Sequence, residues 1–240
     1  MSVNDNDKAN LIPIARGQGV WLHDFDGNRY LDGISSWWVN LFGHAHPELN
    51  AALRQQADTL EHVILAGFTH EAIVELSERL VALAPPGLNK CFYADNGSSG
   101  IEVALKMSLH AWRNLGKPEK TRFIALENSY HGETIGALGV TDIPLFSETY
   151  RPMLRPPLRA PSPAGRHPGE SLPDAAARAM AAMDALLAEH AHEVAAVIVE
   201  PLVQGAAGMR MYDASYLTLL RAACDRHGVH LIADEIAVGF

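Results

Sequence analysis

The chain contains little cysteine: Cys91 and Cys224 are its only two, far apart and outside any CxxC pattern. This spacing argues against a disulfide framework and against a thiolate zinc site. No apolar run approaches the length that crosses a membrane, and the polar, acidic residues 1–10 fit neither a secretory signal nor a transit peptide. We therefore expect a protein of the reducing cytoplasm without a membrane partner.

Basic residues are also scarce, with 19 Lys and Arg against 28 Asp and Glu and a formal net charge of −9. No Lys/Arg stripe is present that could follow a phosphate backbone, so we do not expect nucleic acid as a partner. The hydrophobic fraction of 48% and the charged fraction of 20% are near the averages for soluble globular proteins. A chain of this length can bury a sizeable core.

The hydrophobic pattern changes along the chain. Residues 20–32 alternate around an Asp-Gly-Asn turn and predict a β-hairpin, whereas 47–60 and 71–83 have the three- and four-residue spacing of amphipathic helices. Short apolar runs, which we interpret as strands, then alternate with helices. These runs are 91–94, 122–126, 195–199 and 229–233. Such alternation predicts an α/β fold with a mainly parallel sheet flanked by helices.

The segment 151–173, here called the proline-rich segment, contains seven of the fourteen prolines. It can be neither a helix interior nor a central strand. We interpret it as a surface excursion within one domain, although a domain linker is the alternative. Ser171 and Asp174 then resemble a helix start. Apolar residues lie along one face of this helix: Ala176, Met180, Met183 and Leu187.

A strand-to-helix junction at 95–100 carries the first chemical signal. Unpaired N–H groups at a helix start favour an anion, the glycines Gly97 and Gly100 permit close approach, and Ser98 and Ser99 add donors. An ordinary capped turn is the alternative. A second alternative is a hydrolase that uses Ser98 as nucleophile, although the first glycine of a G-x-S-x-G elbow is replaced by asparagine.

Three further signals lie at strand ends. Tyr130 could present its ring to a planar ligand or be a loop aromatic, and the adjacent His131 could be a base. Glu200 could face a ligand crevice or cap a loop. Asp234 follows a buried strand, where a carboxylate needs a cation or several donors, either an internal arginine or a ligand.

Histidine and tryptophan pairs give weaker signals. His44 and His46, like His190 and His192, lie two residues apart, a spacing that suits two metal ligands only on an extended strand, and neither pair has a third histidine nearby, so we expect no metal site. Trp37 and Trp38 pack in a core or line a pocket.

Taken together and in order, five motifs resemble the class III, fold-type I aminotransferases, from about Leu11 to the last residue. They are Tyr30-Leu31-Asp32-Gly33-Ile34-Ser35-Ser36-Trp37-Trp38, Gly97-Ser98 with 102–106, Tyr130-His131-Gly132-Glu133, 200–205 and 234–240. The resemblance implies pyridoxal 5'-phosphate (PLP) as cofactor and a large PLP-binding domain at 61–240, preceded by a small-domain segment, a hairpin and helix, at 1–60.

The resemblance also implies a role for each motif. Gly97, Ser98 and Ser99 would hold the phosphate. Tyr130 would stack on the pyridine ring, with His131 and Glu200 beside the cofactor. Asp234 would pair with the ring nitrogen and so keep the ring an electron acceptor. Trp37 and Trp38, together with Tyr130, would contact the substrate.

The double tryptophan favours the branch of the family that converts 8-amino-7-oxononanoate to 7,8-diaminononanoate in biotin synthesis, with S-adenosylmethionine as the expected amino donor and a homodimer as the expected assembly. Another ω-aminotransferase is the alternative within the family. None of the five lysines matches the Schiff-base lysine, and an upstream tyrosine and a C-terminal substrate arginine have no counterpart. We therefore expect the front portion of an aminotransferase, inactive by itself.

Overall fold

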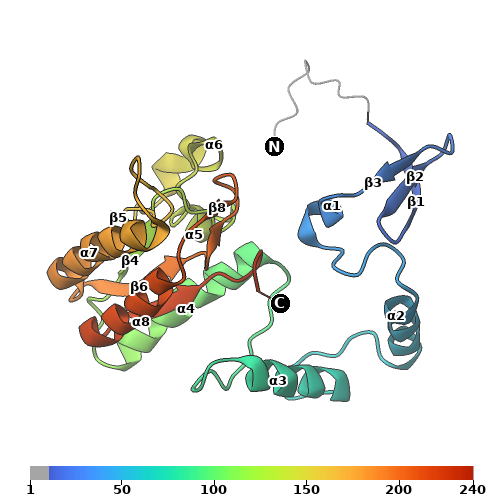
Figure 1. Cartoon of the computed structure of the whole chain (residues 1–240). Helices are drawn as coiled ribbons and strands as arrows, with labels where there is room; N and C mark the ends of the chain where they lie inside the picture. Colours follow the sequence, from blue (N-terminus) through green and yellow to red (C-terminus); the bar gives the residue numbers. More distant parts are fainter. Residues whose placement is uncertain (1–10, 240) are drawn as a thin grey trace. The chain divides into compact units, whose positions relative to one another are not determined.

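The computed structural model describes residues 11–239 (Figure 1). The chain divides into two compact units, Met1–Cys91 and Phe92–Phe240. The boundary between a small-domain segment and a large domain near residue 60, which the resemblance implies, stays a prediction.

The first unit opens with a three-stranded antiparallel sheet. Its strands are β1 (Ile14–Gln18), β2 (Trp21–Asp24) and β3 (Arg29–Leu31). Strands β2 and β3 form the predicted hairpin, and Gly27 adopts a φ of +85° in its turn. The Asp24 carboxylate stabilises this turn because it accepts hydrogen bonds from the Asn28 backbone N–H at 2.8 Å and from the Tyr30 hydroxyl at 2.9 Å.

A short turn and two helices follow the hairpin. They are α1 (Ser35–Trp38), α2 (Pro47–Thr59) and α3 (Glu71–Leu83). Helices α2 and α3 are those predicted from the sequence. Pro47 stands in the first turn of α2, where its missing N–H costs nothing. The α1 turn is left-handed at Ser36 and Trp37, unlike an α-helix.

The second unit is built on a four-stranded sheet in the order β5-β4-β6-β9, with every neighbouring pair parallel. The strands are β4 (Arg122–Leu126), β5 (Leu158–Ala160), β6 (Val194–Val199) and β9 (His230–Ala233). All six side chains of β6 are buried, as in a parallel strand covered on both faces. The predicted α/β class is confirmed.

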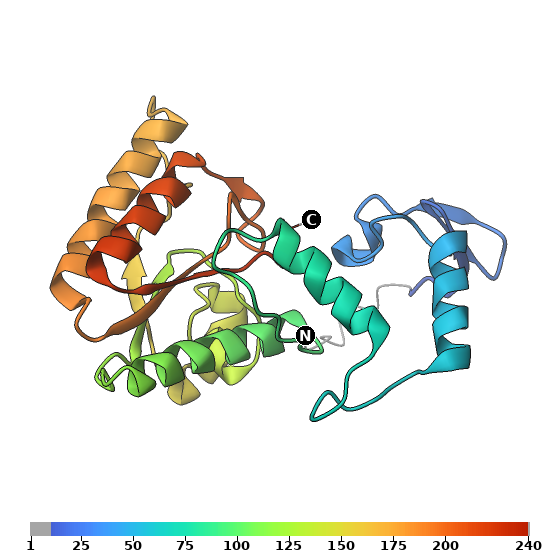
Figure 2. The same ribbon diagram turned by 90° about the horizontal axis from the view of Figure 1, so that it is seen from below.

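Helices cover both faces of this sheet, so that the unit has three layers (Figure 2). They are α4 (Gly97–Asn114), α5 (Ile135–Leu138), α7 (Leu172–His190) and α8 (Ser215–His227). Strand residues divide between the faces: Ile124 and Val197 share a core with α7 and α8, whereas Ala125 and Ile198 share one with α4 and α5.

Helix α7 begins as predicted. The Ser171 hydroxyl accepts a hydrogen bond from the Asp174 N–H at 3.2 Å, and the predicted apolar face is buried. Short elements complete the unit: α6 (Pro144–Ser147), the 3-10 helix η1 (Glu148–Met153), β7 (Val203–Gln204) and β8 (Arg210–Met211).

Two sequence predictions require correction. Residues 91–94 form no strand: they are part of none of the described sheets and their side chains are exposed, so this segment lacks the hydrogen-bonded ladder of a strand. The proline-rich segment is not merely a surface excursion, because it contains β5, which extends the sheet beside β4 and buries Ala160. Strand β5 lies at an edge of the described sheet, where neighbouring prolines are tolerated.

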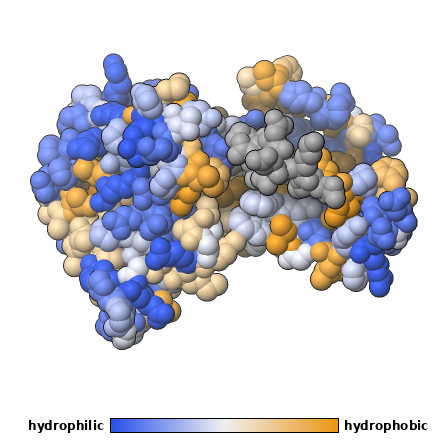
Figure 3. Space-filling view, turned by 90° about the horizontal axis from the view of Figure 1, so that it is seen from above, coloured by the Kyte–Doolittle hydropathy of each residue, from blue (hydrophilic) through white to orange (hydrophobic). Residues whose placement is uncertain are grey.

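Hydrophobic atoms interrupt the hydrophilic surface of both units (Figure 3). Trp37 and Phe42 in the first unit are 71% and 64% exposed. None of the helices in residues 11–239 combines the length and apolar character needed to span a bilayer.

Candidate active site

The carboxyl ends of three parallel strands carry the polar residues singled out from the sequence. Tyr130 and His131 lie in the loop after β4, Glu200 directly follows β6, and Asp234 directly follows β9. Because parallel strands all end at the same edge of a sheet, these residues are brought together although they are far apart in sequence. They form one cluster within the second unit, linked by the hydrogen bond from the Tyr130 N–H to Glu200 and by the bond between the His131 and Asp234 side chains.

A buried histidine–carboxylate pair lies in this cluster. His131 Nδ1 is 2.8 Å from Asp234 Oδ2, and the two side chains are 0% and 5% exposed. Since a carboxylate can only accept, Nδ1 is the donor. The predicted partner of Asp234 was an arginine or a ligand; within the chain it is His131. The second ring nitrogen of His131 is buried and has no hydrogen-bond partner among the described residues.

Glu200 joins the strand ends β4 and β6. Its Oε2 accepts a hydrogen bond from the Tyr130 N–H at 3.0 Å, and its Oε1 accepts one from the Gly205 N–H at 2.9 Å. Burial raises the pKa of Glu200 above its ordinary value. The Tyr212 hydroxyl donates to the Glu200 carbonyl at 2.6 Å, which fixes the backbone from the other side.

Tyr130 is held at its backbone by Glu200 and at its hydroxyl by Glu133. The hydroxyl donates to Glu133 Oε1 at 3.1 Å, and the ring lies 5.1 Å from Phe146 at an angle of 58°. Burial, together with Glu133, raises the pKa of Tyr130 to about 12. Its phenol therefore stays protonated at neutral pH and acts as a hydrogen-bond donor.

Helix α4 starts beside this loop. The Asn96 side chain caps it by accepting a hydrogen bond from the Ser99 N–H at 2.9 Å, which leaves the N–H groups of Gly97 and Ser98 without partners inside the helix. Ser98 Oγ accepts a hydrogen bond from the Glu133 N–H at 3.2 Å. The predicted anion-binding junction and the Tyr130 loop are thus neighbours.

Gly132 makes this close approach feasible. Its φ is +112°, and a Cβ placed on it would lie 2.1 Å from Ser98 Oγ, well inside van der Waals contact. Any larger residue would push the loop away from the start of α4. The motif Tyr130-His131-Gly132-Glu133 contains this glycine, but the sequence does not show that Ser98 Oγ is the atom it must leave room for.

The hydrolase alternative lacks its geometry. The hydrogen bond to Ser98 Oγ comes from a backbone N–H, and no histidine within residues 11–239 is hydrogen-bonded to that hydroxyl. His131 directs Nδ1 to Asp234, but its other nitrogen has no serine partner. A nucleophile, base and orienting carboxylate are therefore not assembled.

Several anchors of the Tyr130 loop were missed by sequence reasoning. Glu102 accepts hydrogen bonds from the N–H groups of Gly136 and Ala137 at the start of α5, at 2.6 and 3.3 Å. Asp142 Oδ2 accepts one from the Asn128 N–H at 2.8 Å. The Thr134 side chain does not cap α5, and no local sequence pattern identifies these distant acceptors.

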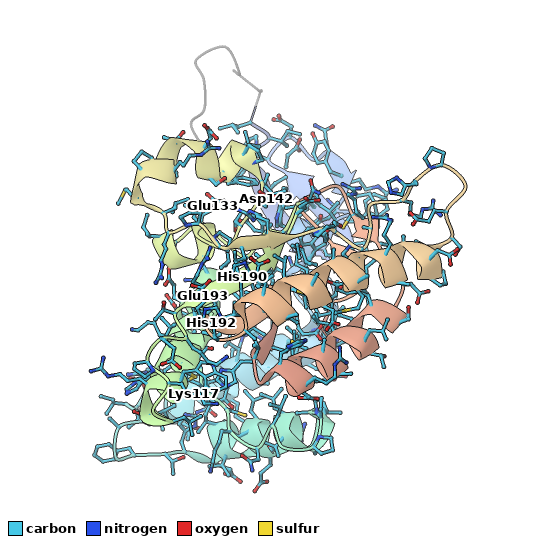
Figure 4. The ribbon with its side chains drawn as sticks, turned by 90° about the vertical axis from the view of Figure 1, so that its left-hand side faces the viewer. Lys117, Glu133, Asp142, His190, His192 and Glu193 are labelled. Atoms are coloured by element: carbon cyan, nitrogen blue, oxygen red, sulfur yellow. The ribbon has the colours of Figure 1, made fainter. Side chains whose placement is uncertain are left out.

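The opposite end of the unit has a different set of charged residues. Figure 4 labels Glu133 and Asp142 and shows them apart from Lys117, His190, His192 and Glu193. His190 Nδ1 lies 2.9 Å from Glu193 Oε1, which gives the histidine a structural partner. Within residues 11–239 no three histidine, cysteine or acidic side chains are grouped so as to hold a metal ion.

Trp37 and Trp38 belong to the first unit. Their ring centroids are 5.9 Å apart with the planes tilted by 40°, and Trp38 is 46% exposed. Neither is part of a buried core among the described residues, which removes the simple core-packing alternative for this part of the chain. Their role in a substrate pocket stays a prediction.

A helix start with unpaired N–H groups, an aromatic loop and a buried carboxylate, all at the carboxyl edge of a parallel sheet, are the arrangement of a fold-type I PLP enzyme. Comparison with known proteins agrees. The family model described as "Aminotransferase class-III" matches residues 2–240, and the chain belongs to the class III aminotransferase family.

Two curated relatives have close to half of their aligned residues identical to those of this chain. The adenosylmethionine-8-amino-7-oxononanoate aminotransferase of Geobacter sulfurreducens is 45% identical over 98% of the chain and 52% of the relative. That of Helicobacter pylori is 47% identical over 96% of the chain and 51% of the relative. The chain spans about half the length of the curated relatives it matches.

Solved structures have the same fold. The Methanocaldococcus jannaschii enzyme of that name matches with a TM-score of 0.86 and 36% identity, over 96% of this chain and 50% of that one. An amine transaminase from an uncultivated Pseudomonas species, solved in its PLP-bound form, matches with a TM-score of 0.90 and 32% identity, over 100% of this chain and 55% of that one.

Class III aminotransferases depend on PLP, and the described residues fit this cofactor. The unpaired N–H groups at the start of α4, with the Ser98 hydroxyl, suit a phosphate dianion. Gly132 leaves the close approach at Ser98 open, and Asp234 supplies an acceptor for a protonated ring nitrogen. The donors at the start of α4 and the acceptor Asp234 therefore suit the two ends of the cofactor.

Proposed function

We propose that the protein containing this chain transfers an amino group to 8-amino-7-oxononanoate, giving 7,8-diaminononanoate in biotin biosynthesis. The observation that carries the proposal is the cluster of the α4 start, Tyr130, and the His131–Asp234 pair at one sheet edge. The names of the curated relatives support this particular substrate. S-adenosylmethionine is the proposed donor, and the reducing cytoplasm is the proposed setting.

The residues of the cluster have separate roles in the proposal. Gly97 and Ser98 bind the phosphate through N–H and hydroxyl donors. Ser99 is the third proposed phosphate ligand, although its N–H donates to Asn96 Oδ1 at 2.9 Å and its side chain is hydrogen-bonded to Asp95. Tyr130 stacks on the ring, and Asp234 accepts the hydrogen bond of the ring nitrogen. When bound, PLP supplies an electron-accepting ring that stabilises charge on the substrate carbon.

His131 and Glu200 position these groups in the proposal. His131 donates to one oxygen of Asp234, and the Ile236 N–H donates to the other at 3.3 Å, so the carboxylate is oriented by two donors. Glu200 fixes the backbone of Tyr130, and its carboxylate lies near the cofactor. Trp37 and Trp38, with Tyr130, contact the acceptor.

Covalent attachment of the cofactor requires a lysine, and the described lysines do not supply it. Lys106 is exposed on α4, while Lys120 donates to the carbonyls of Ala191 and Val194. Lys8 lies outside the described residues. We propose that a lysine outside these 240 residues holds PLP and moves the substrate proton, in a homodimer.

The test uses the full-length protein that contains these residues. Absorbance spectra with and without PLP, and borohydride reduction followed by peptide mapping, are expected to identify a cofactor-labelled lysine. Conversion of 8-amino-7-oxononanoate is then measured with S-adenosylmethionine or lysine as donor. No bound PLP and no labelled lysine would refute the proposal. Transfer between simple amines and keto acids without use of 8-amino-7-oxononanoate would instead place the protein among ω-transaminases.

Asp234→Asn tests the residue assignment. Because the amide cannot replace the charge opposite the ring nitrogen, kcat is expected to fall by about 100-fold or more, consistent with loss of one preorganised electrostatic contact. Asp213→Asn is the matched control, since Asp213 lies in the same unit and its carboxylate accepts hydrogen bonds from Ser215, whose N–H is at 2.9 Å. Equal activity of the two variants would remove Asp234 from the proposed mechanism.

A further inference from the structure

The turn that carries Trp37 and Trp38 has an uncommon backbone. Four consecutive non-glycine residues have positive φ: Ser35 (50°), Ser36 (49°), Trp37 (71°) and Trp38 (68°). A side chain with a Cβ is sterically disfavoured in this left-handed region, and left-handed residues normally occur singly. Contacts from outside the turn must therefore hold it in place.

Asp32 makes those contacts. Its Oδ1 accepts a hydrogen bond from the Ser36 N–H at 2.9 Å, and its Oδ2 accepts from the Ser36 hydroxyl at 2.6 Å and from His44 Nε2 at 2.8 Å. The side chains of Asp32 and His44 are 6% and 16% exposed. The Ser36 bonds, with a smaller contribution from His44, lower the pKa of Asp32 to about 2. One carboxylate thus binds both the turn and the histidine.

Both ends of the loop 33–43 are fixed to the hairpin. The Asp32 N–H donates to the Val20 carbonyl at 2.9 Å, and Gly19 and His44 exchange two backbone hydrogen bonds at 2.8 and 2.9 Å. A Cβ on Gly17 would lie 2.7 Å from the Cβ of His44, so the histidine also packs closely against β1. Asp32 and His44 are therefore rigid supports and the turn is the part they hold.

We propose that Asp32, through Ser36 and His44, is a positioning residue that sets acceptor specificity by fixing the directions of Trp37 and Trp38. This inference rests on the proposed function, in which the two indoles contact 8-amino-7-oxononanoate. Two side chains on successive left-handed residues point in directions that a right-handed or extended turn cannot reproduce. Loss of the Asp32 contacts releases the turn and moves both rings at once.

Two adjacent serines provide a matched test. Ser35 and Ser36 share nearly the same φ, but only the Ser36 hydroxyl reaches Asp32; the Ser35 hydroxyl has no hydrogen-bond partner among the described residues. In the PLP-loaded full-length protein, Ser36→Ala is expected to raise KM for 8-amino-7-oxononanoate about tenfold, as for loss of one hydrogen bond to a charged group, with kcat changed less than about twofold. Ser35→Ala is expected to match the wild type.

Asp32 variants extend the test. Asp32→Ala is expected to raise KM more than Ser36→Ala does. Asp32→Asn, which keeps one acceptor oxygen, is expected to raise KM less than Asp32→Ala does. Melting temperature and tryptophan emission are recorded for every variant, and a shift of emission with Ser36→Ala but not with Ser35→Ala is expected. Equal KM values for the two serine variants, or a fall in melting temperature without a change in KM, would overturn the inference.

Trp37→Ala and Trp38→Ala separate this inference from the proposed function. If neither changes KM for 8-amino-7-oxononanoate, the assignment of the tryptophans to the acceptor pocket is wrong. If either raises KM while the Asp32 and Ser36 variants leave it unchanged, the pocket assignment stands and the positioning role of Asp32 is refuted.

Discussion

Gly132→Ala should damage both the stability and the PLP site, because of one close approach. Gly132 has a φ of +112°, and its added Cβ would lie 2.1 Å from Ser98 Oγ and 2.8 Å from Ser98 Cβ. An alanine at positive φ costs about 1–2 kcal/mol, and overpacking adds about 1–3 kcal/mol. The expected loss in free energy of unfolding is about 2–5 kcal/mol.

The same substitution moves the proposed phosphate donor. A lost hydrogen bond to a charged group costs about 1.5–3 kcal/mol, so the dissociation constant of PLP is expected to rise about 10- to 100-fold. Gly208→Ala is the matched control, since Gly208 also has positive φ, at +95°, but its Cβ would meet nothing within 4 Å. It is expected to lose about 1–2 kcal/mol and keep its affinity for PLP.

Urea unfolding of the cofactor-free full-length protein measures the first quantity, and titration with PLP followed by absorbance measures the second. If the two glycine variants lose equal stability and bind PLP equally well, the contact between Gly132 and Ser98 has no energetic role. A stability difference without an affinity difference would keep the packing argument and remove Ser98 from the phosphate site.

Three further predictions concern the fold. Trp112→Phe is expected to cost about 1–3 kcal/mol in urea unfolding, because the buried indole donates to the Ala195 carbonyl at 2.8 Å and the phenyl ring cannot. The lowered pKa of Asp32 contributes stability that is present above the ordinary carboxyl value of 3.8 and is lost as pH falls toward about 2; acid titration of tryptophan emission is expected to show a transition in this window that Asp32→Asn removes. Arg178→Lys is expected to speed proteolytic cleavage of the proline-rich segment, because lysine cannot reproduce the two bonds to Glu170 at 2.8 and 2.9 Å; an unchanged cleavage rate would contradict this.

Local patterns predicted much of the fold. The strand expected at 122–126 has those bounds in the structure, α2 and α3 follow the predicted spacing, and α7 begins at the predicted cap. These features depend on neighbouring residues, whose periodicity and capping chemistry are visible in the sequence. The strand expected at 91–94 depends on a pairing partner, and it is absent from the described structure.

Partners across the site could not be predicted in the same way. The five motifs indicated Asp234, His131 and Glu200 as site residues. The pairing of His131 with Asp234, however, depends on the spatial order of the strands in the sheet, which the motifs do not contain. The left-handed turn at Trp37 and Trp38 contradicts local propensity, because it contains no glycine and is held by Asp32. Such tertiary contacts override the local preference of the chain.

The hydrogen bonds at the sheet edge also have a kinetic consequence. Tyr130 and Glu200 are 70 residues apart in sequence, and His131 and Asp234 are 103 apart. Closing such long loops costs chain entropy before the contacts form, so we expect these bonds to form late in folding. The His131–Asp234 bond requires β9 to have joined β6, and this bond is therefore a marker that the described strands β4, β6 and β9 have assembled.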